Sequence, residues 1–202
     1  MTPEFDKQYW EAHWAAGQGT SGLPVHPALD SELADLVPGT AIDAGSGEGA
    51  EAAWLAANGW TTTAVDISAH AITRANTRPT PSIGRGTVAW VEADLTVWEP
   101  DQQVELVTTF YAHPSMSQHA FYERISQWVA PGGTLLIVGH HHDGGHGQPH
   151  PENAVTGPEQ IRALFDHSAW IVHTAETRER TVTVPGGSSI TLRDVIARVE
   201  RI

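Results

Sequence analysis

Residues 40–49 read Thr-Ala-Ile-Asp-Ala-Gly-Ser-Gly-Glu-Gly, and this stretch decides the fold. Its apolar start is typical of a buried parallel strand. Gly45, Gly47 and Gly49 then allow the backbone to bend sharply and to bring main-chain N–H groups against a ligand. An Ala-rich helical stretch follows. The segment therefore predicts a strand, a glycine-rich turn and a helix.

Two acids near this turn indicate the kind of ligand that it binds. Asp66 ends the next apolar run, 21 residues after Gly45, where a carboxylate can hold both hydroxyls of a ribose. Asp43 lies two residues before Gly45, where it would repel a pyrophosphate but attract a cationic ligand. Dinucleotide-binding turns need Gly-x-Gly-x-x-Gly, whereas these glycines alternate. We expect a cofactor that carries a nucleoside and a positive charge but no phosphate.

Residues 43–49, together with Asp66, resemble motif I of Rossmann-like (class I) S-adenosylmethionine-dependent methyltransferases. The Pro-Gly-Gly at 131–133 and the apolar run after it resemble the fifth-strand motif of that superfamily. With residues 110–113 and 138–140, the chain is similar to small bacterial methyltransferases of the tellurite-resistance and thiopurine types. The resemblance implies a Rossmann-like three-layer α/β sandwich with a seven-stranded, mostly parallel sheet and an antiparallel last strand. It also implies methyl transfer from S-adenosyl-L-methionine.

Length and composition favour a single domain over residues 1–202, in which residues 1–39 form an N-terminal helical cap region. No apolar run approaches the roughly 20 residues that a membrane-spanning helix needs. The N-terminus lacks the pattern of a signal peptide, so we expect a cytoplasmic protein with no membrane partner. The net charge of −13 argues against nucleic acid as a partner.

The absence of cysteine excludes disulfides, thiolate metal sites and a cysteine nucleophile. Lys7 is the only lysine, which excludes Schiff-base chemistry, a P-loop and the Tyr-x-x-x-Lys pair of short-chain dehydrogenases. These exclusions leave chemistry that depends on positioning a bound cofactor. Because methyl transfer is an in-line displacement, alignment and desolvation can supply much of its rate.

Hydrophobic periodicity and turn residues predict alternating strands and helices, and hence a parallel sheet covered by helices. We expect strands over residues 40–45, 61–66, 87–92, 104–110, 134–138, 170–176 and 191–200. We expect helices over residues 4–16, 30–36, 51–57, 69–77, 116–129 and 159–166, the fifth of which is ended by Pro131-Gly132-Gly133. The last two strands read as an antiparallel pair joined by an arm around residues 185–187.

Ligands of open α/β sheets bind at the carboxyl ends of the strands, near the switch in strand order. This rule places the glycine turn (residues 45–49), Asp66-Ile67, Asp94-Leu95 and residues 110–113 around one cleft. The resemblance implies that Asp94 accepts the adenine amino hydrogen, and Ile67 can pack on an adenine face. The predicted cofactor-binding residues are Asp43, Gly45, Ser46, Gly47, Gly49, Asp66, Ile67, Asp94, Leu95, Phe110 and Tyr111.

His113, just after the fourth strand, is the candidate catalytic residue. It would act as a base only if the acceptor must lose a proton, and otherwise it packs beside the cofactor. The sequence does not name the acceptor beyond a small molecule, and the chain is expected to be a monomer or a homodimer. Two other classes remain open: a non-catalytic S-adenosylmethionine-binding or metal-binding protein, and a nicotinamide-dependent oxidoreductase.

The stretch 139–158 contains five histidines and five glycines, and its length and composition predict an irregular loop. Imidazole binds zinc, copper and nickel, so a metal site is conceivable here. No spacing among these histidines matches a known metal geometry, however. We therefore expect a flexible, metal-independent cover for the acceptor side of the cleft.

Overall fold

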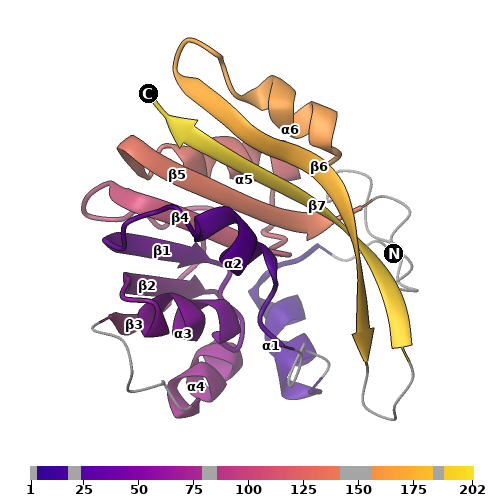
Figure 1. Ribbon diagram of the computed structural model, residues 1–202. Helices are drawn as coiled ribbons and strands as arrows, with labels where there is room; N and C mark the ends of the chain where they lie inside the picture. Colours follow the sequence, from indigo (N-terminus) through magenta and orange to yellow (C-terminus); the bar gives the residue numbers. More distant parts are fainter. Residues whose placement is uncertain (1–3, 18–23, 79–85, 142–155, 184–188) are drawn as a thin grey trace.

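The computed structural model describes residues 4–17, 24–78, 86–141, 156–183 and 189–202 (Figure 1). The strands are β1 (Thr40–Ala44), β2 (Thr61–Asp66), β3 (Thr87–Glu92), β4 (Val104–Phe110), β5 (Val129–His140), β6 (Trp170–Thr183) and β7 (Ser189–Arg201). The helices are α1 (Lys7–Ala15), α2 (Ala28–Leu33), α3 (Ala50–Ala57), α4 (Ala69–Thr77), α5 (Gln118–Ser126) and α6 (Pro158–Leu164).

All seven strands form one sheet in the order β3-β2-β1-β4-β5-β7-β6. The strands from β3 to β5 are parallel, while β7 runs antiparallel to both β5 and β6. The predicted fold class is therefore confirmed, and the bounds of β2, β3 and β4 agree with the sequence prediction. The strand order reverses between β1 and β4, which is where ligands bind in sheets of this kind.

Helices pack on both faces of the sheet and bury two hydrophobic clusters. On one face, Phe121 and Ile125 of α5 and Ile161 of α6 are fully buried. On the other face, Leu29 of α2 and Leu55 of α3 are fully buried. In the part of the chain that the structure describes, no helix is long and apolar enough to cross a membrane.

The side chains that begin the helices follow local capping rules. Asp6, Ser68 and Ser117 each accept a hydrogen bond from the backbone N–H three residues later. Each bond satisfies a donor that the first turn of a helix leaves without a partner. This fixes the starts of α1, α4 and α5, and the start of α4 matters most here because it directly follows Asp66.

The boundary between α5 and β5 differs from the sequence prediction. The helix expected over residues 116–129 ends at Ser126, and the Pro-Gly-Gly run lies inside β5 instead of ending the helix. Pairing with β4 is irregular here. Val129 pairs with Val104 and Thr134 pairs with Leu106, so the four residues 130–133 lie opposite the single residue Glu105. A Cβ on Gly133 would lie 2.9 Å from the backbone oxygen of Glu105, so glycine allows this close approach.

The last two strands form a hairpin that is longer than the sequence predicted. Pairing between β5 and β7 ends at His140 and Asp194, whereas β6 and β7 pair onward to Thr183 and Ser189. The far end of the hairpin therefore extends past β5 (Figure 1). The arm expected around residues 185–187 lies outside the described residues, as do parts of two predicted loops, residues 18–23 and 142–155.

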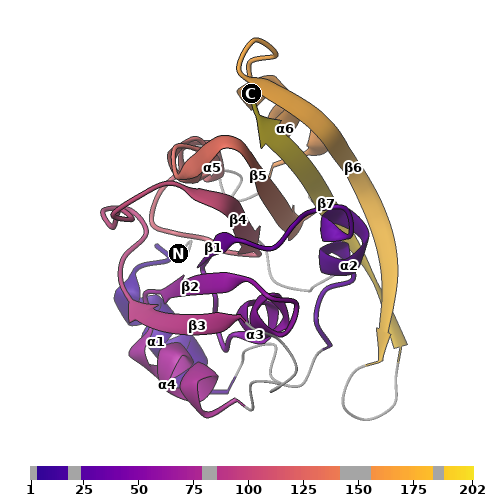
Figure 2. The ribbon, with the colours of Figure 1, turned by 60° about the vertical axis from the view of Figure 1, so that its left-hand side comes forward.

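The segment 24–36, which contains α2, attaches to the hairpin through ion pairs and hydrogen bonds. Glu32 accepts a 2.8 Å hydrogen bond from Thr174 and pairs with Arg178 at 2.7 Å. Arg198 donates two hydrogen bonds, of 2.7 and 2.9 Å, to Asp35. Figure 2 shows α2 beside the hairpin. Residues from the beginning and the end of the chain therefore share one face of the sheet.

Candidate active site

The glycine turn after β1 is crowded by two other segments, which explains its residue types. Gly45, Gly47 and Gly49 all have positive φ, a region that residues with side chains rarely adopt. A Cβ on Gly45 would lie 2.3 Å from the Cβ of Ala112, and a Cβ on Gly47 would lie 3.1 Å from the ring of Trp14. The turn therefore lies between the loop after β4 and helix α1.

Asp66, at the end of β2, fastens this turn. Its Oδ2 accepts a 2.8 Å hydrogen bond from the backbone N–H of Gly47, and its Oδ1 accepts one of 2.9 Å from Ser68. Burial raises the pKa of Asp66, although these two hydrogen bonds act in the opposite direction. The carboxylate thus lies where the loops after β1 and β2 meet, at the place predicted for ribose recognition.

Asp43 is buried in β1 beside other acids. Its Oδ1 accepts a 2.9 Å hydrogen bond from the hydroxyl of Thr108. Burial, and then the negative charges of Glu51 and Asp66, raise the pKa of Asp43 to about 8. A cationic group bound nearby would favour the charged form of this carboxyl. The electrostatics of the turn therefore suit a positively charged ligand and oppose a phosphate.

Two buried oxygen atoms of the turn, Oδ2 of Asp43 and Oγ of Ser46, have no hydrogen-bond partner among the described residues. Buried polar groups are normally paired, and an unpaired one costs about 1–3 kcal/mol. An ammonium group is a donor of the kind that such oxygen atoms accept from. With the glycines that admit a ligand to the backbone, these residues fit S-adenosylmethionine.

The loop after β3 also reaches the turn. Asp94 accepts a 2.8 Å hydrogen bond from the backbone N–H of Thr96, so its carboxylate is held in a tight local turn. Leu95 is buried, and a Cβ on Gly45 would lie 4.0 Å from it. Ile67 is half-buried, directly after Asp66. The predicted adenine-binding residues therefore lie on loops adjoining those of the predicted ribose-binding residues, and their roles stay predictions.

Tyr111 belongs to a buried polar cluster at the end of β4. Its hydroxyl donates a 2.6 Å hydrogen bond to Asp194 and accepts one of 3.0 Å from Arg180. Arg180 also donates a 2.5 Å hydrogen bond to Asp194. The φ of Tyr111 is 56°, which is uncommon for a residue with a side chain and indicates local strain. Phe110, just before it, packs with its ring centroid 5.7 Å from that of His26.

His26 completes this cluster in a defined tautomer. Its Nδ1 accepts a 3.1 Å hydrogen bond from the backbone N–H of Ala28, so its proton is on Nε2. Nε2 lies 3.2 Å from Oδ2 of Asp194 and donates to it. Burial raises the pKa of Asp194, but hydrogen bonds from His26, Tyr111 and Arg180 outweigh it and lower the pKa to about 2. Burial and the charge of Asp194 raise the pKa of Tyr111, which therefore stays protonated.

Five aromatic rings form a stacked row along the carboxyl edge of the sheet. Neighbouring ring centroids are 4.5–5.7 Å apart, with interplanar angles of 16–30°. We refer to these rings as the ring column. In order they belong to Tyr111, His140, His113, Phe5 and Trp10. The column connects the polar cluster to helix α1.

His113, at the centre of the ring column, is held by Gln118 of α5. The Gln118 side chain donates a 3.0 Å hydrogen bond to the backbone oxygen of Ala112, so its Oε1 is directed to the imidazole. That oxygen lies 3.2 Å from Nδ1 of His113, which must therefore donate. The lone pair of the neutral ring is consequently on Nε2, the tautomer that a base would need.

Sequence reasoning missed Asp194, Arg180, His26, Gln118 and Glu11. A carboxylate inside the predicted strand 191–200 was the available signal for Asp194, because carboxylates are seldom buried unless they are paired. The other four residues carry no local signal. Of the histidines expected in a loop, His140 lies in β5 and His141 directly follows it, while the remaining three fall outside the described residues.

Comparisons with known proteins agree with the fold and the turn. Residues 41–133, from β1 into β5, match the family model of a methyltransferase domain. No curated protein sequence matches the chain. A solved structure from work on conversion of a disulfide bond into a thioacetal group during echinomycin biosynthesis is 19% identical, with a TM-score of 0.72. The match covers 96% of this chain and 92% of that one.

Two further solved structures have the same fold. TehB from Haemophilus influenzae is 14% identical with a TM-score of 0.68, over 95% of this chain and 66% of that one. DhpI, solved as a complex with SAH, is 22% identical with a TM-score of 0.60, over 98% of this chain and 96% of that one. At these identities the likeness shows the fold alone.

Residues 41–133 therefore match a methyltransferase domain, and the sheet that contains them has the fold of the solved structures just described. This match agrees with the resemblance of residues 43–49 and Asp66 to S-adenosylmethionine-dependent methyltransferases.

Proposed function

We propose that the chain is a methyltransferase, and that it transfers the methyl group of S-adenosylmethionine to a small-molecule acceptor that binds at the ring column. One observation carries the proposal: His113 directly follows Ala112, whose Cβ packs against Gly45 of the turn. The predicted cofactor site and the ring column therefore meet at two consecutive residues. Magnesium protoporphyrin IX methyltransferase from Synechocystis, which is named for a small-molecule acceptor, supports a small acceptor by analogy, because its structure has the same fold.

Five of the predicted cofactor residues have a role that their position supports. Asp66 would hold the ribose hydroxyls, since its carboxylate lies between the loops after β1 and β2. Asp43 and Ser46 would receive the ammonium group, which satisfies their buried oxygen atoms. Asp94 and Leu95 would bind the adenine. The bound cofactor would supply the methyl group of its sulfonium to the acceptor. The rest of the cofactor would then leave as a neutral thioether, S-adenosylhomocysteine.

His113 would act on the acceptor and not on the cofactor. Its Nδ1 donates to Gln118, so the neutral ring carries its lone pair on Nε2, the atom that would take a proton from the acceptor. This step matters only for acceptors that must lose a proton, such as thiols, phenols and carboxylic acids near their pKa values. Tyr111 is unsuited to the task because its hydroxyl is bound by Asp194 and Arg180.

An acceptor-panel assay tests the proposal by measuring release of S-adenosylhomocysteine with chalcogen oxyanions, thiols, phenols and carboxylates. We expect turnover with at least one class. Gln118→Leu should slow the turnover of an acceptor that must lose a proton, and it should shift the pH profile of that turnover. The reason is that His113 loses the group that fixes its tautomer. Glu123→Leu, on the exposed side of the same helix, is the matched control and should leave the rate unchanged.

The alternative classes give different results in the same experiments. A non-catalytic binding protein would be stabilised by S-adenosylhomocysteine but would show no turnover with any acceptor. A nicotinamide-dependent oxidoreductase would be stabilised by NADH and not by S-adenosylhomocysteine. Saturating ligand at about 100 times its dissociation constant adds about 2.7 kcal/mol to the free energy of unfolding, which a thermal shift detects readily.

A single domain over residues 1–202, with a cap region over residues 1–39, stays a prediction and forms part of this proposal. The same holds for a cytoplasmic location, for the absence of nucleic-acid partners and for a monomeric or homodimeric state. Size-exclusion chromatography with light scattering would test the oligomeric state directly.

A further inference from the structure

Helix α1 crosses the carboxyl edge of the sheet and contacts three of its loops. Trp14 packs against Gly47 in the loop after β1. Trp10 donates a 3.1 Å hydrogen bond from its indole N–H to the backbone oxygen of His113, in the loop after β4. Glu11, which lies between these two tryptophans in sequence, reaches the loop after β2. The helix therefore touches both the predicted cofactor site and the ring column.

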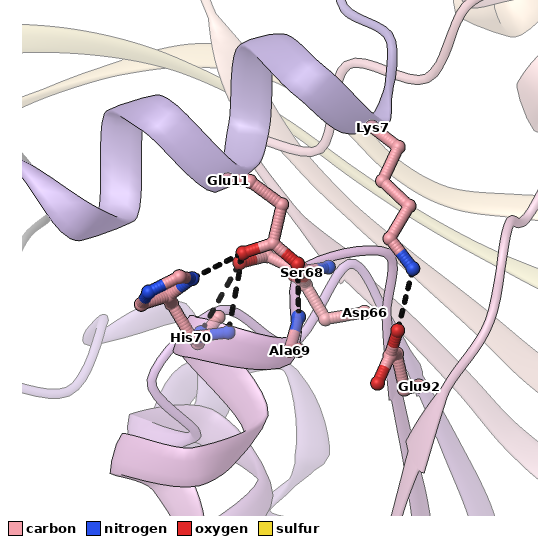
Figure 3. A network of polar contacts seen from close by, with 8 residues as sticks. Lys7, Glu11, Asp66, Ser68, Ala69, His70 and Glu92 are labelled. Carbon is pink, nitrogen blue, oxygen red and sulfur yellow. Dashed lines mark hydrogen bonds and ion pairs between the residues drawn. The ribbon is translucent and has the colours of Figure 1, made fainter.

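The carboxylate of Glu11 binds the start of α4 (Figure 3). Its Oε1 accepts a 2.7 Å hydrogen bond from the backbone N–H of Ala69. Its Oε2 accepts hydrogen bonds from the hydroxyl of Ser68 at 3.0 Å and from the backbone N–H of His70 at 3.4 Å, and it also contacts the His70 ring. Although burial opposes this, the pKa of Glu11 falls to about 2 because these donors favour its charged form.

Ser68 joins Glu11 to Asp66. The backbone N–H of Ser68 donates to Oδ1 of Asp66 at 2.9 Å, while its hydroxyl donates to Glu11 and accepts from Ala71. Ser68 is fully buried, so these bonds are shielded from water. A displacement of Glu11 is therefore transmitted through one residue to the carboxylate predicted to hold the ribose.

A second ion pair on α1 is more exposed than the contacts of Glu11 and connects α1 to β3 instead of to Asp66. Lys7 pairs with Glu92 at the end of β3, and the two side chains are 57% and 42% exposed, whereas that of Glu11 is 22% exposed. Exposed ion pairs contribute little, because water screens the charges and two flexible side chains must be ordered. The Lys7–Glu92 pair belongs to the same helix but has no bond to the loop after β2. It serves as a matched control.

We propose that Glu11 is a positioning residue for the cofactor: it fastens α1 across the cleft, so that Trp14 and Asp66 enclose the ribose end of S-adenosylmethionine. The inference rests on the proposed cofactor site. Loss of the carboxylate lets α1 move away from the start of α4 and opens the path by which cofactor leaves. The principal effect of its removal is therefore a faster dissociation of cofactor.

The test compares wild type, Glu11→Gln and Lys7→Met for binding of S-adenosylhomocysteine, by calorimetry and by stopped-flow measurement of both rate constants. We expect Glu11→Gln to raise the dissociation rate constant about tenfold, with little change in the association rate constant. Lys7→Met should stay within twofold of wild type. Hydrogen exchange of residues 7–15 in the complex should be faster in Glu11→Gln than in wild type.

Glu11→Asp keeps the charge but shortens the reach, and it replaces Glu11→Gln if that variant does not fold. Dissociation within twofold of wild type in the folded variant would overturn the proposal. So would an equal loss in Lys7→Met, because it would mean that any weakening of α1 has the same effect. If the wild-type chain binds no S-adenosylhomocysteine, the cofactor site itself is refuted, and this inference falls with it.

Discussion

The hydroxyl of Tyr111 donates a 2.6 Å hydrogen bond to Oδ1 of Asp194, although 83 residues separate them in sequence. Asp194 also accepts bonds from Arg180 and His26, and its side chain is only 1% exposed. One carboxylate thus ties the end of β4 to the terminal hairpin and to the segment before α2. It also fixes the ring of Tyr111, the first member of the ring column.

Replacement of Asp194 by Asn should lower the free energy of unfolding by about 3 kcal/mol, because it leaves the partly buried charge of Arg180 without its counter-ion. Asp35→Asn is the matched control, since Asp35 also pairs with a buried arginine, Arg198, but is itself 67% exposed. That change should cost at most about 1 kcal/mol. Urea unfolding measures both values, and equal losses would contradict the central position given to Asp194.

The energetic cost of crowding at the glycine turn can be separated from the cost of backbone strain with two alanine variants, one at Gly45 in the turn and one at Gly132 in β5. Gly45 and Gly132 both have positive φ, but a Cβ on Gly45 would meet Ala112 at 2.3 Å, whereas one on Gly132 would meet nothing within 4 Å. Gly132→Ala should therefore cost about 1 kcal/mol from strain alone, and Gly45→Ala a further 1–3 kcal/mol, roughly, from overpacking. Denaturant unfolding of both variants gives the comparison, and similar costs would show that Ala112 yields easily.

The stability of the ligand-free protein should fall between about pH 4 and pH 8 through Asp43. Burial, Glu51 and Asp66 raise the pKa of Asp43 to about 8 in the folded state, above its unfolded value of about 4. Between these values the folded state keeps a proton that the unfolded state has lost. Stability therefore decreases as pH rises, by up to about 1.4 kcal/mol per pH unit.

Asp43→Asn removes this dependence, so the difference in unfolding free energy between wild type and variant should change from pH 5 to pH 8. Binding of the cationic cofactor to wild type near pH 7 should also release protons, which calorimetry in buffers of different ionisation enthalpy detects. Parallel stability profiles for the two proteins would show that Asp43 ionises normally.

Asp66→Ala should weaken binding of S-adenosylhomocysteine by about 1.5–3 kcal/mol, through loss of charge-assisted bonds to the ribose. The structure adds a second effect, because the N–H groups of Gly47 and Ser68 lose their acceptor. The free energy of unfolding should therefore fall by about 1–3 kcal/mol as well. Glu92→Gln, at the register partner of Asp66 on the exposed end of β3, should change neither quantity much. Unchanged affinity in Asp66→Ala would place the cofactor elsewhere.

The sequence predicted the first half of the sheet well because its signals are local. The glycines of the turn, the acid at Asp66 and the helix over residues 69–77 each follow from rules that span a few residues. The prediction failed at the Pro-Gly-Gly run of β5, because such a run ends helices as readily as it forms an irregular segment of a strand. Only the alignment of this run against β4 decides between them, and that alignment is not visible locally.

The candidate site also has one part that local sequence signals predict and another part that they do not. Residues on the loops after β1 and β2 could be predicted, because strand ends of one sheet edge must meet. The partners of Tyr111 could not, since Arg180 and His26 gain their positions from a hairpin and a segment at opposite ends of the chain. Glu11 was equally hidden, because nothing near it in sequence indicates that it binds the start of α4.

The attachment of the segment 24–36 to the terminal hairpin has a consequence for the order of folding. The bonds that join them span 142 residues for Glu32 with Thr174 and 168 for His26 with Asp194. During synthesis, this early segment leaves the ribosome long before its partners exist, so its polar groups must stay in water until β6 and β7 are made. Contacts of such high sequence separation slow folding. We therefore expect the segment to dock in the last and slowest step, after the parallel half of the sheet has formed.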